Sequence, residues 1–179
     1  NEKQTKDGDK IDIDIDIDEK NTGEASIGAG YSSTSKANLQ FGLREQNFLG
    51  KGQQLKFQAN LGEEVSTYDI SFAEPYFNNR DLYTKVDLYS QLEDYGSVNY
   101  ETEKLGLGLS LGFPMSYDRR ITINYSIYND KTTADPDATN YEKLLAGTTT
   151  VSSIGHKFVN DRRNSPYKPS SGYIFKITQ

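Results

Sequence analysis

Apolar and polar residues alternate along most of this chain with a period of two. From Lys104 to Phe113 every odd position is apolar, and every even position is glycine, serine or lysine. The same period recurs at 39–44, 55–61 and 121–127. Successive side chains of a β-strand point to opposite faces, so each segment predicts a strand with one apolar and one polar face. Repeated along a chain, this pattern is typical of a transmembrane β-barrel.

The alternation predicts an all-β protein whose strands form one antiparallel, up-and-down sheet. Nine strands are expected, at 25–33, 36–47, 53–63, 67–75, 82–93, 99–113, 118–129, 148–159 and 171–179. Their connections form two alternating sets. One set carries turn residues and aromatic side chains (47–52, 74–80, 113–118 and 160–166), and the other is polar and acidic (32–36, 63–66, 93–97 and 129–147). In a membrane barrel one set faces each side of the membrane.

Aromatic side chains are concentrated in the first set of connections. They are Phe48, Tyr76, Phe77, Phe113, Tyr117 and Tyr167. Such residues form the interfacial girdle of a membrane barrel, and aromatic residues also cap the core edge of soluble sheets. We favour the girdle because the alternation extends along most of the chain.

Composition excludes several classes of function. The 179 residues include 15 Gly, 13 Tyr and 8 Phe, but no Cys and a single His. Disulfides, thiolate metal sites and cysteine nucleophiles are therefore excluded, and we expect neither an enzyme nor a cofactor or metal site. The net charge of −6 without a basic stripe argues against nucleic acid. A mean hydropathy of −0.76 excludes a transmembrane helix but not membrane-spanning strands, whose two faces average out.

The first 24 residues are strongly acidic and form a separate region. They hold nine acidic and four basic residues, a net of −5 of the chain's −6. Residues 11–18 repeat Ile-Asp four times, which predicts a strand with four carboxylates on one face. Neighbouring carboxylates would be roughly 6.6 Å apart, too far for one calcium ion to bridge, so we interpret the row as a solvated face. Residues 21–23 are expected to be a hinge.

Two further features favour structural roles over chemistry. His156 falls inside a predicted strand, where we expect it to point to the polar side as a hydrogen-bonded residue and not as a catalytic base. The glycine-rich stretch 106–112 lacks the turn into a helix that a phosphate loop requires, and its glycines fit a strand that another backbone approaches closely. The last residues, 173–179, look like a strand cut in its middle, so a fragment is expected.

Several segments in register resemble the Omp85 superfamily of outer-membrane assembly proteins, and within it the BamA type. Members carry periplasmic POTRA domains followed by a sixteen-stranded barrel. The similar segments are 11–23 (last POTRA strand and joint), 25–33 (first barrel strand), 47–53 (first periplasmic turn), and 72–77, 111–115 and 161–172 (later turns). The chain departs from the family at Asn164, where the family usually has Asp, and it lacks the second barrel half with its lid-loop motif.

The resemblance implies two regions: residues 1–22, the end of a POTRA domain and the hinge, and residues 23–179, the N-terminal part of an outer-membrane β-barrel. It implies a lateral gate strand at Ser26, Ile27, Gly28, Ala29, Gly30, Tyr31 and Ser32. It implies periplasmic turn motifs at Asn47, Phe48, Gly50, Glu74, Pro75, Tyr76, Phe77, Asp161, Arg163, Pro166, Pro169 and Gly172.

The function implied by the resemblance is the folding and insertion of β-barrel proteins into the outer membrane of a diderm bacterium. Clients would enter through a weakly paired seam at the first barrel strand, where main-chain groups carry the interaction. Expected partners are unfolded outer-membrane proteins, accessory assembly lipoproteins and outer-membrane lipid, with the N-terminal segment in the periplasm.

Three alternatives have their own signatures. An Omp85-type translocation channel, of two-partner secretion or a companion assembly complex, would share these motifs. A passive porin would lack the POTRA-like leader. A soluble β-sandwich that binds glycans through its tyrosines would bury the apolar face in its own core.

Overall fold

The computed structural model describes residues 2–4, 11–13, 20–33, 36–94 and 97–179. Strands dominate this part of the chain. The elements are β1 (Glu2–Gln4), β2 (Ile11–Ile13), β3 (Gly23–Ser32), β4 (Lys36–Phe48), β5 (Gln53–Gly62), β6 (Val65–Glu74), the 3-10 turn η1 (Phe77–Asn79), β7 (Tyr83–Asp94), β8 (Tyr100–Ser116), β9 (Arg119–Ala134), α1 (Asn140–Leu145), β10 (Gly147–Asp161) and β11 (Ile174–Thr178).

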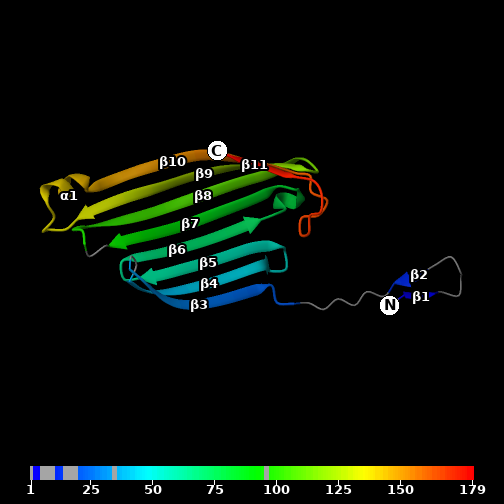
Figure 1. The fold of residues 1–179 in the computed structure, drawn as a ribbon, viewed down its shortest axis with the longest axis horizontal. Coiled ribbons are helices and arrows are strands. Elements are labelled where there is room, and N and C mark those ends of the chain that lie inside the picture. Colours follow the sequence, from blue (N-terminus) through cyan, green and yellow to red (C-terminus); the bar gives the residue numbers. More distant parts are fainter. Residues whose placement is uncertain (1, 5–10, 14–19, 34–35, 95–96) are drawn as a thin grey trace.

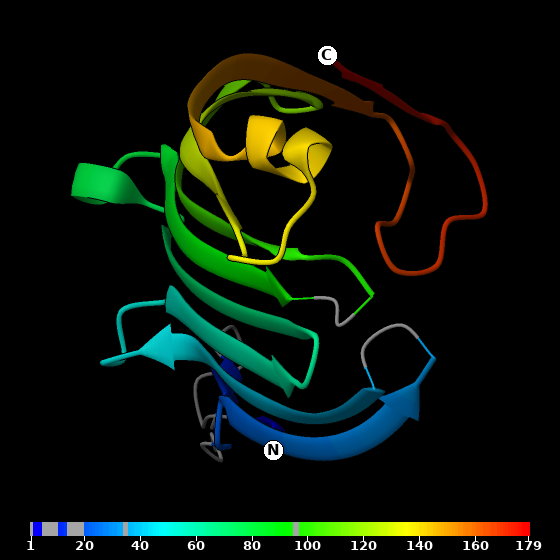
Figure 2. The same cartoon turned by 90° about the vertical axis from the view of Figure 1, so that its left-hand side faces the viewer.

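Nine of these strands form one antiparallel sheet in sequence order, from β3 to β11 (Figure 1). Each strand pairs with the next one along the chain, which is the up-and-down topology that the sequence predicts. The sheet curves into an open trough (Figure 2). It does not close, because β3 and β11 are its two terminal strands and do not pair with each other. The all-β, nine-stranded prediction is confirmed.

The strand register sorts the side chains into two faces, since residues directly opposite each other in neighbouring strands share a face. One row across β4 to β9 is entirely apolar: Leu43, Phe57, Ile70, Leu88, Leu107 and Ile127. The adjacent row from β4 to β10 is polar or glycine: Arg44, Lys56, Ser71, Asp87, Gly108, Ser126 and Ser153. We call these the apolar face and the polar face.

The apolar face is not covered. Leu43 is 56% exposed and Leu88 is 50% exposed, although both lie in the apolar row. Among the described residues, the buried hydrophobic side chains are three alanines only: Ala59, Ala73 and Ala138. A β-sandwich would bury this face against a second sheet, so the single layer argues against the soluble sandwich alternative. The uncovered apolar band suits a surface that contacts lipid.

The two sets of connections lie at opposite ends of the strands (Figure 1). We call the end with the aromatic turns the turn end, and the end with the acidic connections the loop end. At the loop end, β9 is longer than predicted and reaches Ala134, which lies opposite Tyr100, the first residue of β8. Residues of opposite charge continue the pairing of β8 with β9 beyond the apolar band. Lys104 Nζ lies 3.8 Å from a carboxylate oxygen of Asp130, the residue directly opposite. Apolar periodicity alone could not detect these polar pairs.

The loop between β9 and β10 contains α1, which the sequence analysis missed. Thr139 and Glu142 form a reciprocal capping box, in which each side chain accepts a hydrogen bond from the other residue's backbone N–H. The cap lowers the pKa of the Glu142 carboxyl, because the backbone and hydroxyl of Thr139 donate to its charged form. No helix within the described residues is long and apolar enough to cross a bilayer.

The N-terminal region has its own pair of strands. β1 and β2 are antiparallel, with Lys3 opposite Asp12. Of the predicted Ile-Asp strand, residues 11–13 are in β2 and residues 14–18 lie outside the described residues. The predicted hinge at 21–23 has no regular structure at 21–22, and β3 begins at Gly23.

Candidate functional site

The predicted gate strand coincides with β3, one margin of the sheet. β3 pairs with β4 on one side, from Gly23 opposite Glu45 to Ser32 opposite Lys36. On its other side no strand in the described part of the chain pairs with it. Alternate residues of an antiparallel strand direct their N–H and C=O groups to each side. A terminal strand therefore offers a row of main-chain donors and acceptors to an added strand.

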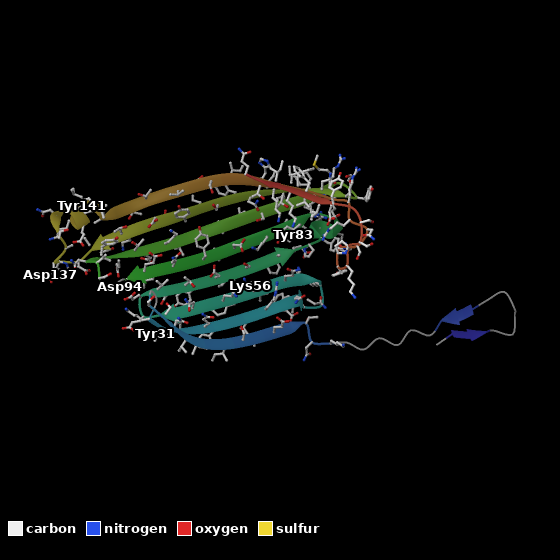
Figure 3. The ribbon with its side chains drawn as sticks, in the orientation of Figure 1. Tyr31, Lys56, Tyr83, Asp94, Asp137 and Tyr141 are labelled. Atoms are coloured by element: carbon white, nitrogen blue, oxygen red, sulfur yellow. The ribbon has the colours of Figure 1, made fainter. Side chains whose placement is uncertain are left out.

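The two faces of β3 differ strongly. Ile27 and Tyr31 lie on the apolar face and are each 76% exposed; Tyr31 lies near the loop end (Figure 3). On the polar face β3 carries small residues, including Ser26, Gly28 and Gly30. A hollow of about 470 Å³ on β3 to β5 is lined in part by Ser26 and Gly42. The small side chains of β3 therefore leave open space on the polar face at this margin of the sheet.

The first predicted turn motif stabilises the start of this margin. The Asn47 side-chain oxygen accepts from the Gly52 backbone N–H at 2.6 Å, and the Asn47 carbonyl accepts from Gly50 at 2.9 Å. Gly50 has a φ of +69°, which favours glycine. The Glu45 carboxylate accepts from the Asn47 backbone at 2.7 Å and from the Thr22 hydroxyl at 2.5 Å. This network connects the residue before β3 to the turn after β4.

The second predicted motif, between β6 and β7, is organised by Glu74. Its carboxylate accepts from the backbone N–H of Tyr76 at 2.9 Å and from the side chain of Gln53 at 2.7 Å. Tyr76 and Phe77 are 66% and 52% exposed, while Pro75 begins the turn. Polar contacts hold the turn. Its aromatic side chains remain exposed and available to contact a membrane interface or a partner protein.

The third and fourth turns are joined by an ion pair that sequence reasoning missed. Asp118 is buried, and its carboxylate accepts from Ser116 at 2.6 Å and from Arg162 Nε at 2.7 Å. The Ser116 hydroxyl and then the Arg162 guanidinium lower the pKa of Asp118, and the same contact raises the pKa of Arg162. Asp118 and Arg162 are 44 positions apart, and no local spacing relates them. We call this pair the turn clamp.

The predicted Asp161 and Arg163 form a separate local pair. Arg163 donates to both oxygens of Asp161, at 2.8 and 2.6 Å. Asn164, where the family usually has Asp, accepts from the backbone of Ser170 and Ser171 at 3.0 and 3.1 Å. The amide thus makes the backbone hydrogen bonds that a carboxylate could make, and its NH₂ also donates to the Ser170 hydroxyl at 2.8 Å.

The remaining predicted residues of this turn occupy its exterior or its base. Pro166 and Pro169 lie in the long connection 162–173, and Tyr167 between them is 93% exposed. Gly172 has a φ of +96°, and a Cβ there would overlap the Arg162 carbonyl. The structure therefore brings Asp161, Arg163 and Gly172 together at the base of one turn, distant in sequence from β3.

The placement predicted for His156 is wrong. His156 lies directly opposite Ile123 in β9, and Ile123 lies opposite Leu111 in β8, so His156 belongs to the apolar face. The sequence analysis treated Ile154 as the exception in this strand, but Ile154 faces Tyr125 on the same apolar side. His156 is therefore a polar residue on the apolar side, as is Ser152, which lies opposite Ile127. Within the described residues, no group of three or more His, Cys, Asp or Glu side chains could hold a metal ion.

Comparison with known proteins identifies the family. The sequence profile of the Omp85 superfamily domain matches residues 47–179. The chain belongs to the Omp85 superfamily. It is 28% identical over 172 residues to the outer membrane protein assembly factor BamA of Nitratidesulfovibrio vulgaris, covering 94% of this chain and 21% of that protein. It is 23% identical over 171 residues to the human sorting and assembly machinery component 50 homolog, covering 94% of this chain and 36% of that protein.

A solved Omp85-type structure has the same fold. The crystal structure of BamA from Haemophilus ducreyi lacking POTRA domains 1–3 matches 99% of this chain and 37% of that chain, with a TM-score of 0.62 and 22% sequence identity. The chain thus spans well under half the length of these relatives. The open nine-stranded sheet corresponds to part of a BamA-type barrel, which explains why β3 and β11 do not meet.

Proposed function

We propose that this chain forms the N-terminal part of the barrel of an outer-membrane β-barrel assembly factor, and that client strands add to its first barrel strand, β3. The observation that carries the proposal is the margin itself. Within the described part of the chain, β3 is paired on one side only, exposed at every residue but Gly28, and nearly bare on its polar face. The printed names of the relatives, an outer membrane protein assembly factor and a sorting and assembly machinery component, favour assembly over the translocation-channel alternative.

The mechanism follows from the chemistry of the edge. In the intact barrel β3 would meet the closing strand in a seam, and a client strand would replace that partner by β-augmentation. Main-chain N–H and C=O groups supply the affinity, and glycine in a strand interior weakens the seam that must open. The apolar face contacts lipid and the polar face lines the lumen. No step requires a nucleotide, a metal or a covalent intermediate.

The surroundings of the edge complete the proposal. Residues 1–22 would be the end of a POTRA domain and its joint, which delivers clients to β3. The turn end and this N-terminal segment would lie in the periplasm, and the barrel in the outer membrane of a diderm bacterium. Accessory lipoproteins of the assembly machinery would bind on the periplasmic side, where the exposed Tyr76, Phe77 and Tyr167 provide contact area.

The test is to stiffen the margin in the full-length protein. Replacing both glycines, Gly28→Val and Gly30→Val, should strengthen the seam and lower assembly activity. Both substitutions can be accommodated, because a Cβ at Gly28 would lie 3.9 Å from Gln40 and one at Gly30 3.2 Å from the movable amide of Asn38. Insertion of a reporter barrel into outer-membrane vesicles measures the effect.

Ala134→Val is the matched control, because it adds bulk at the loop end of β9, far from β3 in the sheet. It should leave insertion of the reporter unchanged. Unchanged insertion by the double glycine variant would remove β3 from the mechanism.

A further inference from the structure

An acidic side chain lies over the point where the chain enters the sheet. Glu45 in β4 lies directly opposite Gly23, the first residue of β3, and opposite Leu55 on its other side. It occupies a position of the apolar face, two residues after Leu43, although it carries a charge. A Cβ at Gly23 would be 2.8 Å from a Glu45 carboxylate oxygen, so the carboxylate lies against the bare backbone of Gly23.

The Glu45 carboxylate connects the residue before β3 to the turn after β4. It accepts from the Thr22 hydroxyl at 2.5 Å and from the Asn47 backbone N–H at 2.7 Å. The main chain of β4 also contacts Thr22, because the Gln46 N–H donates to the Thr22 carbonyl at 3.2 Å. Thr22 precedes β3, so its side chain and its carbonyl extend the attachment to β4 one residue beyond the strand.

The turn after β4 does not need Thr22 to keep its shape. The Gly52 N–H donates to the Asn47 side-chain oxygen at 2.6 Å, and the Gly50 N–H donates to the Asn47 carbonyl at 2.9 Å. A hollow of about 600 Å³ lies beside this turn and is lined by residues 20–23 together with Glu45, Asn47 and Gly50. The turn is therefore a fixed support, and the hollow leaves residues 20 and 21 room to take other directions.

We infer that Glu45 is a positioning residue of the joint: it holds Thr22 against the turn 47–52 and so fixes the direction in which residues 1–22 leave the barrel. The inference rests on the proposed function, since this direction matters for assembly only if residues 1–22 deliver clients. Without the hydroxyl contact a single backbone hydrogen bond would hold Thr22, and the joint should take several directions. Delivery to the barrel should then be less efficient, although the barrel stays intact.

Distances between two spin labels in the full-length protein test this inference. The labels are attached at Lys3→Cys in β1 and at Met115→Cys in the third turn, where the native side chain is 61% exposed, with any other cysteines replaced. Thr22→Val keeps the shape of the side chain but removes its donor, so it should broaden the distance distribution. Loss of one such hydrogen bond corresponds to about a two- to tenfold change in the ratio of held to released joint. Thr22→Ser keeps the donor and should preserve the wild-type distribution.

Thr150→Val is the matched control. The Thr150 hydroxyl also donates to a side-chain oxygen, that of Asn129 at 2.8 Å, but between β9 and β10, far from the joint in the sheet. This variant should change neither the distances nor the insertion of a reporter barrel. Glu45→Leu should broaden the distribution at least as much as Thr22→Val, and combining the two should add nothing further, because both remove the same contact.

The outcomes separate this inference from the proposed function. A broader distribution with lower insertion for Thr22→Val, together with wild-type behaviour of Thr22→Ser, supports the inference. An unchanged distribution for Thr22→Val, or a broader one with unchanged insertion, would overturn it and leave assembly by this protein untouched. Failure of the wild type to insert the reporter would overturn the proposed function instead, and the distances would still decide whether Glu45 holds the joint.

Discussion

Two strand pairs of the sheet share the same alternation of apolar and polar residues but differ in how their polar face is packed. β7 and β8 lie in the interior of the sheet, and the Tyr89 ring occupies the space that a Cβ at Gly106 would need. β3 and β4 lie at the margin, and at Gly28 the opposite strand makes only ordinary contact, with Gln40 3.9 Å from the position of a Cβ. The difference shows that glycine does not by itself make a strand weak. What decides is whether the strand opposite supplies a side chain that fills the space.

The largest expected effect is at Gly106. Gly106→Val would force the Tyr89 ring away, because a Cβ at this position overlaps the ring. Overpacking of this kind costs about 1–3 kcal/mol. Urea unfolding of the full-length protein in detergent micelles should show the loss.

Gly28→Val is the matched control for Gly106→Val. It is the same substitution on the same face, and it should change the free energy of unfolding far less, because 3.9 Å separates the new Cβ position from Gln40. Equal destabilisation by the two variants would mean that the margin is as tightly packed as the interior.

The turn clamp should contribute a smaller, local effect. Asp118→Ala leaves Arg162 without its carboxylate and Ser116 without its acceptor, so the connection 162–173 should detach from the turn before β9. We expect faster hydrogen exchange in 162–173. Asp81→Ala, which breaks the exposed pair with Arg120, should have a weaker effect, because both side chains are over 40% exposed. Similar exchange in the two variants would show that burial of Asp118 adds nothing.

The clamp also predicts a pH dependence. The pKa of Asp118 is held below its ordinary value of 3.8, so the carboxylate binds fewer protons in the folded state than in the unfolded state. Its stabilising contribution is therefore fully present above 3.8 and is lost as the pH falls through the lower folded pKa. The protection of 162–173 against exchange, taken relative to the intrinsic exchange rate at each pH, should fall on acidification in the wild type but much less in Asp118→Asn. Parallel profiles would exclude Asp118 as the titrating group.

The sequence predicted the strands of the sheet well. It predicted poorly the contacts between residues that are far apart in the sequence. Alternation placed all nine strands, because a two-residue period is a local property that the ladder preserves. It placed His156 on the wrong face, because a polar residue at a position of the apolar face makes that position look like part of the polar face. It missed Asp118 as the partner of Arg162, because their pairing depends on two turns meeting at one end of the sheet. The Tyr89 ring over Gly106 was equally invisible, since register decides which residues face each other.

The smallest expected effect is in α1, which lies in the connection between two strands of the interior region. Thr139→Ala removes the hydroxyl that caps the Glu142 backbone N–H, a loss of about 1 kcal/mol for the helix. Hydrogen exchange should rise within 140–145 and remain unchanged in β9 and β10, because their ladder runs from Gly147 opposite Thr132 to Asn160 opposite Arg119 without help from the helix. Faster exchange in β9 as well would mean that the interior strands depend on their loop, and that the margin is not the only place where this sheet can open.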